Sequence, residues 1–252
     1  MKEKHKTNQV RPSQLLEQQL NTINEMYKDE LIIDSINPVC TDYIFTFRNH
    51  VPTSDSRSPM AQKYFNDFYQ YMALLKNRSY HFLLKDYSIC RFHYEFNNEY
   101  KLNSYNLLWF PCPFSSKFLG EAKEMCENEL EFMDYMDSIQ LGDQFNFEDF
   151  LLRTPIRVDY DITYEGSREL FHPTAHIHFQ HYHTRAKSNS IFCLYNFMVF
   201  IIENCYPEDN YLFHESENLI NSRMRRDFNY WLKEKDLLNK ELGLNIYTKL
   251  GL

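Results

Sequence analysis

The sequence predicts an α+β fold in which a mainly antiparallel sheet is flanked by helices in a single domain. Two observations favour this class: apolar residues recur at helical spacing in several separate segments, while other segments alternate with a period of two. No internal repeat or low-complexity linker divides the 252 residues. We therefore expect a flexible N-terminal tail over residues 1–12 and one domain over residues 13–252.

The first part of the chain alternates between helical and strand-like segments. A helix is expected from Ser13, because apolar residues recur at helical spacing as far as Tyr27. A strand pair at 31–36 and 42–48 should follow. A Ser-Pro pair, a typical helix start, then begins a helix expected over 58–76.

Further strands and helices are expected in the remainder. Residues 79–111 alternate with a period of two and predict antiparallel strands, and residues 115–139 predict a helix with an acidic outer face. Two more strands are expected at 155–162 and 174–181, followed by a mostly apolar helix over 190–206. The helices at 58–76 and 190–206 should pack on the apolar side of the sheet. A basic helical segment is expected over about the last 40 residues.

Composition argues against several functional classes. The chain has only 5 Gly and contains neither G-x-G-x-x-G nor G-x-x-x-x-G-K, which disfavours Rossmann and P-loop enzymes. A net charge of −8 is unfavourable for a general nucleic-acid binder, although a local basic face stays open. The 6 Cys form no C-x-x-C pair, so a zinc ribbon is not expected.

The N-terminal sequence and the length of the apolar runs predict a cytoplasmic protein. The N-terminus has no apolar stretch typical of a signal peptide, so the Cys residues should stay reduced thiols. The longest apolar run, 191–202, is too short to span a bilayer, and we expect no membrane partner.

The strongest chemical signal lies in residues 155–183. Alternate residues of a strand share one face of its sheet, so each of the two strands expected here presents a polar set. Pairing these strands would bring one guanidinium, two carboxylates and two imidazoles together. The residues concerned are Arg157, Asp159, Asp161, His176 and His178.

This set supports two kinds of chemistry. Asp159, His176 and His178 could hold a divalent metal and leave coordination positions open for water or substrate. The catalytic candidates are His176, His178, Arg157 and Asp161: the imidazoles as acid and base, Arg157 to neutralise a phosphate, and Asp161 to orient a His. The structural alternative is that Arg157 and the carboxylates form a partly exposed ion-pair network and the His are polar residues of the sheet surface. If the His are catalytic, replacing both with Ala should abolish activity and cost roughly 1 kcal/mol or less of stability, because polar-face residues bury little apolar area.

His176-Ile177-His178 also fits the His-hydrophobic-His strand motif of single-strand nicking nucleases. Those enzymes additionally need a Tyr nucleophile on a helix. Tyr195 lies on an expected helix and is the candidate for that role, although a chain with 19 Tyr provides such a match easily.

A longer pattern of four blocks resembles a known family. The blocks run from Tyr87 to Phe96, Leu107 to Pro113, Ile156 to Asp161 and His172 to His178. Their order over about residues 65–210 resembles the uncharacterised bacterial family Domain of Unknown Function 2290. The resemblance implies a cytoplasmic bacterial protein encoded among defence or mobile-element genes, with a protein partner encoded nearby. It implies no particular activity.

These observations together predict a phosphodiester-cleaving, nuclease-like effector of a bacterial defence or toxin-like system, with nucleic acid as its substrate. The alternative is a non-catalytic binding or scaffold subunit of a defence complex. The two hypotheses differ in geometry, because catalysis requires the imidazoles of His176 and His178 to converge with Asp159 or Arg157 in an open pocket.

Overall fold

A computed structural model describes residues 11–28, 30–49, 68–139, 145–151, 153–162, 174–179, 185–188 and 192–207. Helices and strands alternate along these residues, as an α+β fold requires. The helices are α1 (Pro12–Tyr27), α2 (Phe68–Lys76), α3 (Ser116–Glu124), α4 (Glu129–Ser138) and α5 (Leu194–Cys205), with a short 3-10 helix at Phe147–Asp149. The strands are β1 (Ile32–Ser35), β2 (Val39–Cys40), β3 (Ile44–Thr46), β4 (Phe82–Leu84), β5 (Ile89–Phe96), β6 (Leu102–Phe110), β7 (Ile156–Asp161), β8 (Ala175–Phe179) and β9 (Arg185–Lys187).

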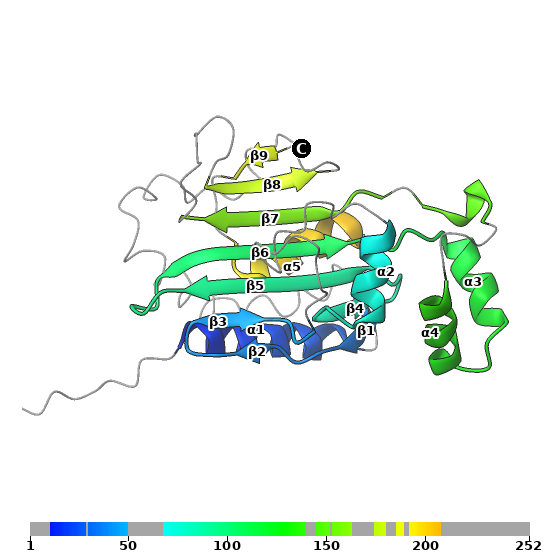
Figure 1. Cartoon of the computed structure of the whole chain (residues 1–252), viewed down its shortest axis with the longest axis horizontal. Helices are drawn as coiled ribbons and strands as arrows, with labels where there is room; N and C mark the ends of the chain where they lie inside the picture. Colours follow the sequence, from blue (N-terminus) through cyan, green and yellow to red (C-terminus); the bar gives the residue numbers. More distant parts are fainter. Residues whose placement is uncertain are drawn as a thin grey trace, which may run out of the picture.

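The strands of the described chain form one nine-stranded antiparallel sheet, which confirms the predicted fold class (Figure 1). The order is β1-β4-β5-β6-β7-β8-β9, while β3 joins β5 along the same edge as β4 and pairs with β2. The long strands β5 and β6 form the centre of the sheet, and β7 and β8 extend it by successive antiparallel pairing. The residues of the expected cluster therefore lie well inside the sheet rather than in loops.

Strand alternation gives the sheet two unlike faces. On one face, apolar residues of the central strands, such as Leu107 and Val158, pack with α1 and α5 in the main core. The opposite face is apolar only at one end, where Ile89 and Leu108 pack with α2, α3 and α4. In Figure 1, α1 and α5 lie behind the sheet and α2 lies in front of it. The middle of this second face is polar and carries the candidate site.

The packing expected for the helix at 58–76 is therefore wrong in its described part. Residues 58–67 lie outside the described residues, and α2 packs on the face opposite α5 rather than beside it. The physical reason is that the polar face ends in an apolar patch. Ile89 and Leu108, on that face, provide α2 with a second, smaller core.

Three boundaries differ from the expectations. The helix expected over 115–139 is two helices, because the Asn128 side chain accepts a hydrogen bond from Glu131 N at 3.0 Å and caps a new helix there. Helix α1 begins at Pro12, inside the tail expected over 1–12. Strand β9 was not predicted. Residues 1–10 and the basic helical segment expected at the C-terminus lie outside the described residues.

All six Cys are free thiols, as predicted: Cys40, Cys90, Cys112, Cys126, Cys193 and Cys205. Across the described helices, none combines the length and apolar character that crossing a membrane requires.

The main core should supply most of the stability that holds the polar face in place. Leu107 is fully buried at the centre of the sheet, whereas Leu130 on α4 is 80% exposed. We expect Leu107→Ala to lower the free energy of unfolding by about 2–5 kcal/mol, because it removes buried methyl groups and leaves a cavity. The matched control Leu130→Ala should change it by less than about 0.5 kcal/mol. Urea denaturation of both variants measures this, and equal losses would contradict the assigned core.

Candidate functional site

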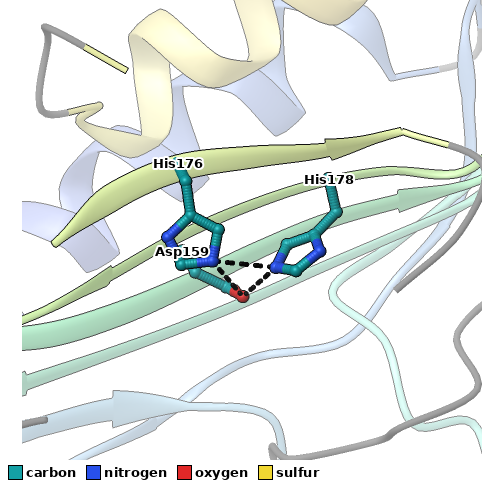
Figure 2. Close-up of side chains that lie close together, drawn as sticks. All are labelled: Asp159, His176 and His178. Atoms are coloured by element: carbon teal, nitrogen blue, oxygen red, sulfur yellow. Dashed lines mark hydrogen bonds and ion pairs between the residues drawn. The ribbon is translucent and has the colours of Figure 1, made fainter. Parts of the chain in front are cut away.

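Four of the five predicted cluster residues meet on the polar face where β7 pairs with β8. The antiparallel register places Asp159 opposite His176 and Arg157 opposite His178. Figure 2 shows the side chains of Asp159, His176 and His178 converging on the side of the strands away from the yellow helix α5. The convergence expected from the alternation of these two strands is therefore present.

The converging atoms have the spacing of a metal site. His176 Nε2 lies 2.9 Å from His178 Nε2, and Asp159 Oδ2 lies 3.0 Å from His178 Nε2 and 3.7 Å from His176 Nε2. A tetrahedral ion with bonds of about 2.0 Å holds its ligand atoms about 3.3 Å apart. The three distances lie on either side of that value, so these three residues could hold one small divalent cation.

The surroundings of His178 Nε2 support the same interpretation. Besides His176 Nε2 and Asp159 Oδ2, this nitrogen has Arg157 Nη2 at 3.0 Å. An imidazole nitrogen offers one hydrogen-bonding position, either an N–H or a lone pair. It cannot bond to all three neighbours at once. A cation bound by His178 Nε2, His176 Nε2 and Asp159 Oδ2 would take the lone pair of this imidazole nitrogen. Arg157 Nη2 would keep its ion pair with Asp159 Oδ2 at 2.8 Å.

Two neighbouring side chains fix Asp159 in place. Arg157 donates from Nε to Asp159 Oδ2 at 3.0 Å, and its Nη2 lies 2.8 Å from the same oxygen. Asn106, on β6, donates from Nδ2 to the other oxygen, Oδ1. Burial by itself would raise the pKa of the Asp159 carboxyl, but the charge of Arg157 and the hydrogen bond with His178 hold this pKa well below its usual value. Asp159 is therefore a fixed carboxylate at neutral pH.

The imidazoles are far more buried than expected. His176 is 2% exposed and His178 is 1% exposed, so the predicted partly exposed face is wrong for these two residues. The side chain of Asp159 is 18% exposed and that of Arg157 is 14% exposed, so these two residues form the solvent-facing edge of the cluster. Replacing either His with Ala would leave buried polar neighbours unsatisfied, at a cost of about 1–3 kcal/mol.

A row of polar residues extends from the cluster across the sheet. His93, Asn106, Asp159 and His176 are successive cross-strand partners on β5, β6, β7 and β8. At the far end of the row, His93 Nδ1 lies 2.9 Å from Thr46 Oγ1, and His93 Nε2 lies 3.0 Å from a carboxylate oxygen of Glu95. Asn106 was not predicted as a site residue, since its position beside Asp159 depends on the pairing of two strands far apart in the sequence.

Two other candidates do not join the cluster. Asp161 lies on the same face of β7 but opposite Ser104, and within the described part of the chain no hydrogen bond joins it to either imidazole. Asn106 and Arg157 hold the cluster together instead. Tyr195 is buried in the core formed with α5, on the other face of the sheet, so it cannot act as a nucleophile beside His176 and His178.

Comparison with known proteins gives a family match. The model of a family described as "Uncharacterized conserved protein (DUF2290)" matches residues 20–238, most of the chain. No curated protein and no solved structure matches it.

The depressed pKa of Asp159 predicts a defined pH dependence. A carboxyl whose folded pKa lies below its unfolded value of about 3.9 stabilises the fold above that value, and this stabilisation is lost as the pH falls further. Asp159→Asn should therefore lower the free energy of unfolding by about 3 kcal/mol at pH 7, because it removes the carboxylate charge that forms the ion pair with Arg157. The difference from wild type should shrink below about pH 4.

Urea denaturation between pH 7 and pH 3 measures this dependence. The control is Asp42→Asn, which removes an exposed ion pair with Arg11 and should change the free energy of unfolding by less than about 1 kcal/mol. A difference between wild type and Asp159→Asn that stays constant down to pH 3 would contradict the assignment.

Proposed function

We propose that the chain, which belongs to the DUF2290 family of uncharacterized conserved proteins, is a metal-dependent phosphodiester-cleaving enzyme of nuclease-like chemistry. The observation that carries this proposal is the convergence of Asp159 Oδ2, His176 Nε2 and His178 Nε2 on one point beside the Arg157 guanidinium. In the setting that the family resemblance implies, it acts on nucleic acid in the cytoplasm as an effector of a bacterial defence or toxin-like system.

The ligand set suits hydrolysis. Two imidazoles and one carboxylate leave coordination positions open, the arrangement found in catalytic zinc and non-haem iron sites. When bound, a divalent metal supplies a Lewis acid and makes water a better nucleophile near neutral pH. Asn106 and Arg157 hold Asp159 in one orientation, and such outer contacts preserve the geometry of a metal site.

The charge balance favours an anionic substrate. The single negative charge of Asp159 is already matched by Arg157. A divalent cation would add two positive charges to this balanced pair, and the site as a whole would then carry an excess of positive charge. A phosphodiester, which is anionic, compensates this excess, whereas a neutral substrate would not.

The burial of both imidazoles is the observation that favours a second candidate function. A buried cluster of this kind could be structural, and the chain would then be a non-catalytic binding or scaffold subunit. Metal binding alone does not separate the candidates. The deciding measurement is whether a stably folded, metal-loaded chain cleaves phosphodiesters.

Metal binding should depend on the cluster and its supporting contacts. The purified chain should hold about one divalent ion, and His178→Gln should remove most of it because a ligand is lost. Asn106→Ala should weaken metal affinity by about 10–100-fold, since Asp159 loses a contact that orients it. His93→Gln, an imidazole of the same polar row outside the cluster, is the matched control and should retain wild-type affinity. Elemental analysis and competition titration with a chromogenic chelator give these values.

Cleavage should follow the same ligands. With the bound metal, the chain should hydrolyse single-stranded DNA or RNA and a chromogenic phosphodiester. His178→Gln and His176→Gln should each lower the rate by about 10²–10⁴-fold, while His93→Gln should keep it. Circular dichroism checks that every variant is folded. A folded His178→Gln protein with the wild-type rate, or a metal-loaded wild type that cleaves none of these substrates, would favour the scaffold candidate.

A further inference from the structure

Among the described residues, Arg91 is a buried cation without an ionic partner. It lies on β5, on the polar face of the sheet, and is 1% exposed. Its Nε and Nη1 atoms are buried and make no hydrogen bond, and across the described residues no carboxylate forms an ion pair with it. Buried guanidinium groups are normally paired and hydrogen-bonded, so this arrangement requires an explanation.

The contacts that Arg91 does make leave its charge largely uncompensated. Its Cζ atom lies 4.2 Å from the centroid of the Phe47 ring, a cation–π contact. Such a contact recovers only part of what a charge loses when it leaves water. Burial, and secondly the positive charge of Arg157, lower the pKa of Arg91 to about 9. Arg91 is therefore still a cation at neutral pH. The positive charge of Arg157, which belongs to the cluster, repels it.

The register places Arg91 beside the candidate site. Arg91, Leu108, Arg157 and His178 are successive cross-strand partners on β5, β6, β7 and β8. Two strand spacings, about 10 Å, separate the backbones of Arg91 and Arg157. Both side chains belong to the same face, with only the apolar Leu108 between them in that row. The two guanidinium groups thus border one region of the polar face next to Asp159, His176 and His178.

We infer that Arg91 is a ligand-binding residue and that, together with Arg157, it forms a phosphate subsite beside the Asp159–His176–His178 cluster. A phosphate group would pair with the buried charge and accept hydrogen bonds from Nε and Nη1, the two atoms that have none. The planar guanidinium fork matches phosphate oxygens in a bidentate manner. The identification of this phosphate with the substrate rests on the proposed function, but the binding itself does not.

A ligand-binding role for Arg91 has an unusual consequence for the stability of the protein. A buried charge that serves a ligand destabilises the protein while the ligand is absent, and replacing it with an apolar side chain is neutral or stabilising. A buried Arg that serves the fold has the opposite behaviour, since its removal destabilises the protein. The melting temperature of Arg91→Met in the absence of phosphate separates these roles independently of any activity.

The experiment uses the full chain after removal of metal by a chelator, with inorganic phosphate as the probe. Calorimetric titration and thermal melting are carried out at constant ionic strength, with chloride replacing phosphate in the reference. Arg91→Met should weaken phosphate binding at least tenfold, consistent with the loss of a charge-assisted hydrogen bond. Its melting temperature without phosphate should equal or exceed that of wild type. Arg91→Lys, which keeps the charge but not the fork, should bind with intermediate affinity.

The matched control is Arg78→Met, which removes an exposed guanidinium paired with Asp34 and should leave phosphate affinity unchanged. The inference is overturned if wild type binds no phosphate, if Arg91→Met binds it as wild type does, or if Arg91→Met melts well below wild type or fails to fold.

Failure of this inference is distinct from failure of the proposed function. If the cluster binds metal and the chain cleaves phosphodiesters while Arg91→Met binds phosphate normally, only the subsite falls. If phosphate binding depends on Arg91 but the chain takes up no metal, the proposed function falls and the subsite remains.

Discussion

The antiparallel pairing of β6, β7 and β8 is the constraint on which the candidate site depends. Because side chains alternate along a strand, a slip of one residue in either pairing would turn a polar residue toward the apolar core. The observed register aligns Asn106, Asp159 and His176 in one row and brings His178 beside Arg157. The apolar residues between them, Val158 and Ile177 among them, fix this register by packing against α5 on the other face.

Electrostatics then determines what the row can do. The charge of Arg157 keeps Asp159 ionised as a carboxylate. The imidazoles of His176 and His178 lie next to it and are almost inaccessible to water. Polar groups in such surroundings interact more strongly than they would in solvent, and they are costly when incompletely satisfied. Arg91 adds a buried guanidinium to the same face. This concentration of charge is unfavourable for folding alone, as expected where a protein gives up stability to bind a ligand.

Only part of this arrangement could be predicted from the sequence. The period-two alternation of Arg157-Asp159 and of His176-His178 depends on local geometry, so the shared faces were predicted correctly. Asn106 and Arg91 were not predicted as site residues, because the pairing of β6 with β7, which joins residues about fifty positions apart in the sequence, brings them to the cluster. The burial of the imidazoles likewise depends on tertiary packing. The position of α2 was wrong for a related reason: alternation shows that a strand has two faces but not which helix covers each.

The contrast between the two faces gives the strongest argument that the polar row is functional. The face under α1 and α5 is apolar along its length, and the end of the opposite face under α2 is apolar as well. The sheet could therefore have continued its apolar packing across the middle of the second face, where Leu108 still lies between Arg91 and Arg157. Apolar residues of similar volume in place of a buried ionic cluster often leave a fold equally or more stable. A polar cluster of one carboxylate, two imidazoles, an amide and two guanidinium groups is not required by the sheet itself and thus supports the proposed binding and chemistry.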